Sequence, residues 1–229
     1  VFFFLSVFYR ISYISISSYF QDPVTYLIKE NIKRGNIYDR NGLILAATVN
    51  SKSLYAEANL IDDVNFLSNK LEKILNIEEE TIKRKLSSKK SFVYLKRNIS
   101  PIEHQKIIDL GEVHLKFEDA KRRVYPFNNS TSHVVGFVDI DQNGQSGVER
   151  FFDNSLVLSE DITLTIDVNL QQSVREKLIE TIKYYKAESG LAIVMDISNG
   201  EILSSVSYPD FNPNDNYTFN ENNLMNRVV

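Results

Sequence analysis

Cysteine is absent from this sequence, and glycine and proline are scarce, with 8 and 5 residues among 229. Without cysteine the chain can form no disulfide, no catalytic thiolate and no cysteine-ligated zinc site. An excess of basic charge is also missing, because 26 Lys and Arg stand against 30 Asp and Glu, a formal net charge of −4. The sequence therefore lacks the basic field by which proteins attract nucleic acids.

Metal-binding patterns are equally weak. The three histidines, His104, His114 and His133, lie far apart, and none has the spacing of a metal ligand. The residues Asp139-x-Asp141-x-Asn143-Gly144 resemble the start of a calcium loop, but its twelfth position holds Arg150 where a glutamate is required. Neither pattern predicts a metal site.

Long apolar runs are also lacking, apart from VFFFLSVFY at residues 1–9. A membrane-spanning helix needs about 20 apolar residues, so this segment is too short to cross a bilayer by itself. It could be the outer end of a transmembrane helix, with aromatic residues such as Tyr13 and Tyr19 near the interface. It could equally be an ordinary buried helix or strand, and the segment alone leaves both interpretations open.

The remaining pattern mixes helices and strands and predicts an α+β fold. Asn41-Gly42 between two apolar pairs is typical of a tight hairpin turn, and Asn199-Gly200 predicts a second hairpin. Apolar residues at helical spacing predict helices, and alternating residues predict strands. The expected helices are 25–32, 62–86, 102–110 and 169–186. The expected strands are 37–38, 43–46, 52–58, 91–97, 113–117, 123–125, 133–140, 162–166, 191–197 and 202–206.

Three motifs carry charge in turn-rich sequence. In Arg34-Gly35-Asn36-Ile37-Tyr38-Asp39-Arg40-Asn41-Gly42, an aspartate between arginines could form charge-assisted pairs that fix a hairpin. The alternative is a surface hairpin with solvated charges. The others are Arg123-Val124-Tyr125-Pro126 and Gly144-Gln145-Ser146-Gly147-Val148-Glu149. If Glu149 is buried, it needs a cationic partner, for which Arg34, Arg40 and Arg123 are candidates.

In this order and spacing, the three motifs resemble the non-catalytic module of class B penicillin-binding proteins. Later stretches resemble the beginning of that family's transpeptidase domain, and these are Thr165-Ile166-Asp167 with Leu170-Gln171, Val194-Met195-Asp196 with Asn199–Leu203, and Tyr208–Asn214. The resemblance covers the chain from end to end, and it favours the interpretation of residues 1–20 as a truncated membrane anchor. It assigns structural roles to Arg34, Gly35, Asp39, Arg40, Asn41, Gly42, Arg123, Tyr125, Pro126, Gly144, Gly147 and Glu149.

The resemblance implies three parts: an anchor at 1–20, an elongated pedestal or dimerisation-type domain at 21–155, and the start of a transpeptidase domain at 160–229. The parent protein would cross-link peptidoglycan outside the cytoplasmic membrane by serine acyl transfer, without a cofactor, and would be acylated by β-lactams. Its partners would be division-complex membrane proteins and lipid-linked or nascent peptidoglycan. The segment Gly136–Asp141 is more similar to the division branch. The alternatives are an elongation-branch enzyme and a β-lactam-sensing receptor with the same pedestal.

The family's catalytic motifs are Ser-x-x-Lys, Ser-x-Asn and Lys-Ser/Thr-Gly. Neither of the last two occurs in these 229 residues. Ser87-Ser88-Lys89-Lys90 satisfies the first formally, but it lies in a charged run at the end of an expected helix. In relatives the nucleophile follows shortly after the position of Asn226-Arg227, so we expect the chain to hold no catalytic residue and to serve as anchor, pedestal and interaction module.

Overall fold

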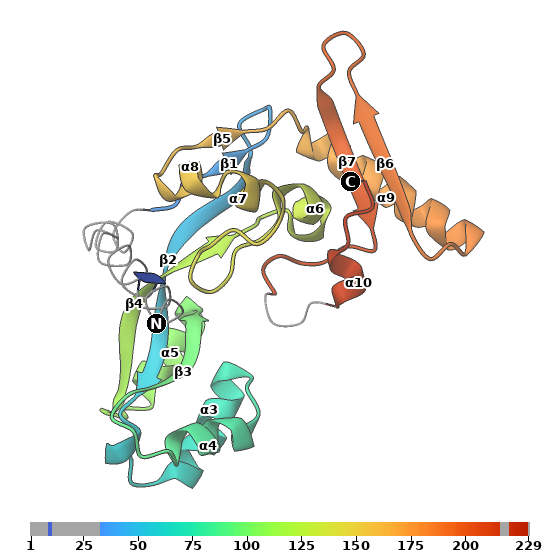
Figure 1. Cartoon of the computed structure of the whole chain (residues 1–229). Helices are drawn as coiled ribbons and strands as arrows, with labels where there is room; N and C mark the ends of the chain where they lie inside the picture. Colours follow the sequence, from blue (N-terminus) through green and yellow to red (C-terminus); the bar gives the residue numbers. More distant parts are fainter. Residues whose placement is uncertain (1–8, 11–32, 216–219, 229) are drawn as a thin grey trace, which may run out of the picture. The chain divides into compact units, whose positions relative to one another are not determined.

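The computed structural model describes residues 9–10, 33–215 and 220–228 (Figure 1). The chain divides into two compact units. The first unit combines the residues up to Leu45 with those from Phe127 onward, and the second unit is Ala46–Pro126. The sequence predicts a boundary between two family domains at residues 155–160. The two compact units do not test that boundary, so it stays a prediction.

The second unit is a sheet covered on one face by helices. Strand β2 (Ile44–Ala56), which begins in the first unit, pairs antiparallel with β3 (Val93–Ile99) and with β4 (Leu115–Val124). Helices α3 (Val64–Leu75), α4 (Glu79–Leu86) and α5 (Pro101–Asp109) bury their apolar residues against it, and a short 3-10 helix, η1, spans Ala58–Leu60. The core consists of Leu54, Ala56, Leu67, Leu71, Leu75, Ile82, Leu86, Leu95, Ile99, Ile107 and Leu115.

The long helix expected over 62–86 is instead two helices. Helix α3 begins at Asp63, whose carboxylate accepts the Phe66 N–H (2.9 Å), and it ends at Asn76 in the left-handed conformation (φ 53°). Asparagine tolerates this conformation and so supplies a stop signal that apolar spacing does not reveal. The two strands expected at 113–117 and 123–125 are likewise one continuous strand, β4.

The first unit begins with a small parallel pair. Strand β1 (Ile37–Tyr38) lies beside β5 (Ile162–Thr163), with Ile37 opposite Ile162. After the second unit, and before β5, the chain forms η2 (Asn128–Thr131), α6 (Ser132–Val135), α7 (Gly147–Phe151) and α8 (Asp153–Val157). The strand expected at 133–140 is wrong in its first half, because Ser132–Val135 is helical and ends at Gly136 with φ 80°. Only Val138 makes a strand-like bridge there, to Gly144.

The remainder of the first unit is a helix packed on a hairpin. Helix α9 (Val168–Tyr185) covers β6 (Gly190–Met195) and β7 (Ile202–Tyr208), which pair antiparallel (Figure 1). Gly190 allows close packing, because a Cβ there would lie 3.0 Å from Ile182 Cδ1 of α9. A last short helix, α10, spans Glu221–Leu224.

One face of this hairpin has little cover. Leu191, Ile193 and Met195 alternate with the residues that face α9, and they are 49%, 49% and 51% exposed. Because a two-stranded hairpin is marginal by itself, we expect the hydrogen-bonded amides of Leu191–Val206 to exchange faster than those joining β2 to β4. Hydrogen exchange on a monomeric sample measures this difference. Equal protection in the two sheets would show that the hairpin needs no further cover.

The expected anchor at 1–20 and helix at 25–32 lie outside the described residues, except for Tyr9 and Arg10. Within the part of the chain that the structure describes, no helix is both long and apolar enough to span a bilayer.

Candidate functional site

A buried ion pair joins the first and third motifs. Arg34 Nε and Nη2 each lie 2.8 Å from Glu149 Oε2, and Nη2 also donates to the Glu149 carbonyl (2.9 Å). Arg34 is 4% exposed and Glu149 is fully buried. Two donors on one carboxylate give a fixed, charge-assisted geometry, which offsets part of the cost of burying both charges. The pairing expected for Glu149 is thus confirmed for Arg34.

Further acceptors complete the environment of the guanidinium. Arg34 Nη1 lies 2.8 Å from Asp153 Oδ1 and donates to the Gln142 carbonyl at 3.1 Å. The same Asp153 oxygen accepts the Gly144 N–H at 2.9 Å. Asp153 was not among the residues expected from the sequence, because nothing in the motif spacing distinguishes it from other acidic residues. It ties the loop before α7 to the start of α8.

The motif glycines permit close backbone approach. A Cβ on Gly35 would lie 2.0 Å from the Glu160 carbonyl oxygen, and one on Gly144 would lie 2.1 Å from the Glu149 carbonyl oxygen. Gly147 has φ 57°, and a Cβ there would lie 2.5 Å from the Val134 carbonyl oxygen. A larger residue would force these segments apart. Gly42 instead serves the hairpin turn, where φ is 83°.

Asp39 holds the beginning of helix α9. It is fully buried, and Oδ1 accepts the N–H groups of Asn41 and Leu43, both at 2.8 Å. Oδ2 accepts the N–H of Val168 at 3.3 Å, the first residue of α9. The expectation that Asp39 pairs with an arginine is wrong: its hydrogen-bond donors among the described residues are backbone N–H groups and the Asn41 amide.

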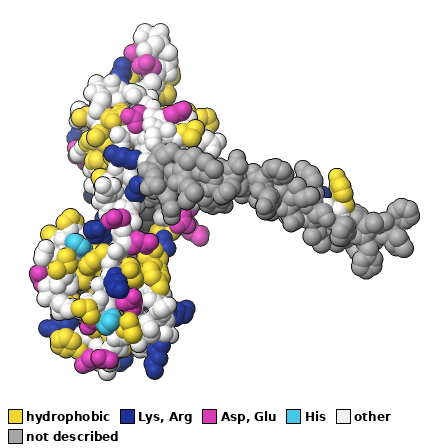
Figure 2. All heavy atoms as spheres, turned by 90° about the vertical axis from the view of Figure 1, so that its left-hand side faces the viewer, with side chains coloured by type: hydrophobic (Ala, Val, Ile, Leu, Met, Phe, Trp, Pro, Cys, Tyr) yellow, Lys and Arg dark blue, Asp and Glu magenta, His cyan; other side chains and the backbone are white. Residues whose placement is uncertain are grey.

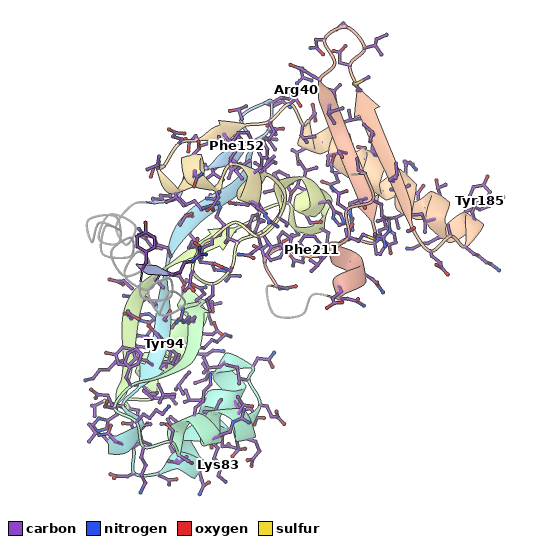
Figure 3. All side chains as sticks on the ribbon, in the orientation of Figure 1. Arg40, Lys83, Tyr94, Phe152, Tyr185 and Phe211 are labelled. Atoms are coloured by element: carbon purple, nitrogen blue, oxygen red, sulfur yellow. The ribbon has the colours of Figure 1, made fainter. Side chains whose placement is uncertain are left out.

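Asn41 and Arg40 extend this contact. The Asn41 side-chain amide donates to Asp167 Oδ2 at 3.1 Å, and Asp167 caps α9 by accepting the N–H groups of Asn169 and Leu170. The Leu170 N–H first, and then the Asn41 amide, hold the pKa of Asp167 below its usual range. Arg40 donates its N–H to the Ile166 carbonyl (3.0 Å) and pairs with Glu201 at 3.3 Å (Figure 3). Because both charged groups are partly exposed, that ion pair stabilises little.

Arg123 and Tyr125 belong to the second unit together with Pro126. Arg123 lies opposite Thr48 in the β2–β4 ladder and donates from Nη1 to Thr48 Oγ1 at 3.0 Å, and both residues are 4% exposed. Tyr125 is 1% exposed. The structure thus brings Arg34 together with Glu149, brings Asp39, Arg40 and Asn41 to the α9–hairpin region, and describes Arg123 within its own unit.

Sequence reasoning named Gln171 only as part of a motif and missed that it is a buried amide in the first turn of α9. Gln171 is 1% exposed, and its amide nitrogen donates to the carbonyls of Ser130 (2.9 Å) and Ser205 (2.8 Å). Its oxygen accepts the Ser204 hydroxyl (2.9 Å) and the Ser205 N–H (2.7 Å). All four polar positions of this amide are therefore used. A glutamine on the apolar stripe of the helix was the one signal in the sequence.

The formal Ser-x-x-Lys and the calcium-like loop both have local roles. Ser87 ends helix α4, the Ser88 hydroxyl donates to the Lys85 carbonyl (2.7 Å), and Lys89 has φ 52°. Asp139 Oδ1 accepts the N–H groups of Asp141 and Asn143, both at 2.9 Å. This is the pattern that Asp39 makes with Asn41 and Leu43, so the loop is an aspartate-stabilised turn.

His133 lies where α6 meets the segment after β7. Its Nε2 is 3.1 Å from the Pro209 carbonyl, and its ring packs edge-on against Phe211 at 5.3 Å. Burial lowers the pKa of His133, while the Pro209 carbonyl and Asp210 oppose that shift and Arg227 adds to it. Asp210 is itself paired with Arg175 at 2.6 Å.

A lowered histidine pKa means that the unfolded chain binds the proton more readily than the folded chain. Stability should therefore fall as the pH drops below the unfolded value of about 6.5. We expect the denaturant midpoint to decrease between about pH 7.5 and 5.5, and the decrease to shrink in His133→Gln, which keeps an N–H donor for Pro209. An unchanged pH response in His133→Gln would contradict the assignment.

Comparison with known proteins identifies a family for this chain. Residues 29–195 match the penicillin-binding protein dimerisation domain. The chain is 29% identical over 228 residues to the probable peptidoglycan D,D-transpeptidase PenA of Neisseria meningitidis (strain Z2491) and 30% identical over 231 residues to the peptidoglycan D,D-transpeptidase FtsI of Escherichia coli K12. Each alignment covers 86% of this chain and 39% of the relative, so the chain spans about two fifths of the length of these relatives.

A crystal structure of a peptidoglycan synthetase from Bifidobacterium adolescentis is similar with a TM-score of 0.47 and 21% identity, covering 79% of this chain and 43% of the other. The family match rests on the dimerisation-domain alignment, which includes Arg34, Asp39, Arg123 and Glu149. The chain belongs to the penicillin-binding protein dimerisation-domain family.

Proposed function

We propose that this chain is the non-catalytic front part of a peptidoglycan D,D-transpeptidase that cross-links stem peptides during septum formation. Relatives named as D,D-transpeptidases, PenA and FtsI, align with 86% of the chain, which supports the reaction class. The similarity to FtsI and the segment Gly136–Asp141 favour the division branch over the elongation branch.

The observation that carries the proposal is the contact between the first motif and helix α9. Asp39 accepts the first N–H of α9, and Asn41 donates to the capping residue Asp167. Gln171 joins the same helix to the Ser130 carbonyl and to β7. The pedestal motifs therefore hold the helix and hairpin that resemble the start of a transpeptidase domain. Such a chain acts by carrying and orienting a catalytic domain, and its own residues perform no acyl transfer.

The proposal also includes location and partners. An anchor at residues 1–20 would hold the protein at the cytoplasmic membrane, with the pedestal outside it. Nascent or lipid-linked peptidoglycan would be the substrate of the whole protein, and division-complex membrane proteins would contact the anchor and pedestal. The similarity to FtsI and the pedestal motifs support this arrangement.

A penicillin-labelling experiment tests the reaction class. A polypeptide of these 229 residues should show no covalent label with fluorescent penicillin after denaturing electrophoresis. An antibody against the second unit should precipitate from the source cells a longer protein that does carry the label and loses it when excess unlabelled penicillin is present. A precipitated protein without label would refute the transpeptidase proposal. A label on the 229-residue chain that disappears in Ser87→Ala would place the nucleophile at Ser87.

The growth phenotype separates the two branches. Depletion of the protein should yield filamentous cells if it acts in septum formation, and rounded cells if it acts in elongation. A depleted strain that keeps its shape but loses its response to β-lactams would favour the sensor alternative.

A further inference from the structure

The face of the second unit's sheet opposite helices α3, α4 and α5 carries a cluster of aromatic rings. Tyr55 on β2, Phe92 just before β3 and Tyr94 on β3 form this aromatic strip. The Tyr55 and Phe92 rings lie 4.6 Å apart at 32°, and the Phe92 and Tyr94 rings lie 4.8 Å apart, edge to face. Phe92 is 45% exposed. Antiparallel sheets usually show polar residues on an open face, so three adjoining rings there require an explanation.

The strip is held in place from three strands. Tyr55 and Tyr94 are direct cross-strand partners, and the Tyr94 hydroxyl donates to Glu118 of β4. The Arg97 guanidinium lies 4.5 Å from the centre of the Tyr94 ring. The opposite face of the same sheet is the buried core against α3, α4 and α5. Because the rings are fixed before any ligand arrives, binding would order few side chains.

The charges around the strip balance one another. Lys116, which lies opposite Tyr55 in the β2–β4 ladder, pairs with Glu57 at 2.8 Å. Glu118 accepts from Tyr94, and Arg97 lies on the same ring. Figure 2 shows both signs of charge beside hydrophobic side chains on this unit. Such a rim presents donors and acceptors without a net field, so it has little electrostatic attraction for a highly charged partner.

We propose that the Tyr55–Phe92–Tyr94 strip binds an uncharged sugar chain. The C–H faces of sugar rings are apolar and can lie on aromatic rings, while the hydroxyl and amide groups at their edges can reach the surrounding carboxylates and cations. The choice of β-linked N-acetylated sugars, as in a glycan strand, rests on the proposed function. The strip would then hold a glycan strand on the second unit.

Binding to an oligomer of β-1,4-linked N-acetylglucosamine tests the proposal. Aromatic proton–carbon NMR spectra of the 229-residue chain should show saturable shifts at Tyr55, Phe92 and Tyr94, and weaker shifts with the matching glucose oligomer. Phe92→Ala should weaken binding about tenfold or more, the size of a lost aromatic contact. The control is Tyr185→Ala, which removes an exposed ring that packs on Tyr184 at 4.9 Å, and it should bind as the parent chain does.

Three outcomes would overturn the inference: no shift at millimolar sugar, equal weakening in both variants, or strip shifts caused only by peptides. An amide spectrum of Phe92→Ala that matches the parent outside the strip establishes that the variant is folded. Because penicillin labelling does not involve the strip, loss of sugar binding leaves the proposed function intact. Sugar binding by a protein that penicillin never labels would instead refute the proposed function alone.

Discussion

Replacing Glu149 by alanine should lower the free energy of unfolding of the first unit by about 3–5 kcal/mol, because it leaves Arg34 buried without its main counter-charge. Arg34 makes three contacts of 2.8–2.9 Å to Glu149, two to the carboxylate and one to the backbone carbonyl, and only the carbonyl contact survives the substitution. Denaturant titration followed by near-ultraviolet circular dichroism measures the loss.

Matched variants separate charge from hydrogen bonding. Glu149→Gln keeps one acceptor oxygen but removes the charge, so we expect a smaller loss than in Glu149→Ala. Glu180 pairs with Lys177 at 2.8 Å on an exposed face of α9, and Glu180→Ala should leave stability unchanged. If Glu149→Ala were as stable as Glu180→Ala, the Arg34–Glu149 pair would not stabilise the first unit.

Replacing Asp39 by alanine should cost about 3 kcal/mol, because buried N–H groups lose their acceptor. The groups affected are the N–H donors of Asn41, Leu43 and Val168. The effect should be regional, reaching α9 and the β6–β7 hairpin through Val168 and through the Asp167 carbonyl, which accepts the Gln171 N–H at 2.8 Å. Asp119→Ala, which removes a surface carboxylate paired with Lys52, is the control and should leave both units unchanged.

The elements that the sequence predicts well are those whose signal is local. The turn at Asn41-Gly42 needs only backbone preferences, and helix α9 at Val168–Tyr185 departs by one residue at each end from the range expected from apolar spacing. The break at Asn76 was missed because the apolar stripe continues across it. Asn76 ends helix α3 by adopting the left-handed conformation, and the spacing of the apolar residues does not reveal this.

The sequence predicted a contact in the site only where two side chains of opposite charge form an ion pair. Burial of Glu149 demands a cation, and three arginines were the available choices. The partner of Asp39 is instead a backbone N–H of a helix that begins 129 residues later. Every residue except proline offers that donor, so no side-chain pattern could identify Val168. Gln171 was overlooked for a related reason, since three of its four partners are backbone groups.

The central claim is that Asp39 of the first motif holds the start of helix α9, and amide hydrogen exchange of Asp39→Ala tests it most directly. The Val168 amide donates to Asp39 in the folded chain, and it should exchange faster in the variant, together with the hydrogen-bonded amides of β6 and β7. The β2–β4 amides of the second unit should keep the protection of the parent chain. Unchanged exchange at Val168 and in the hairpin, or a uniform loss of protection across both units, would contradict the account.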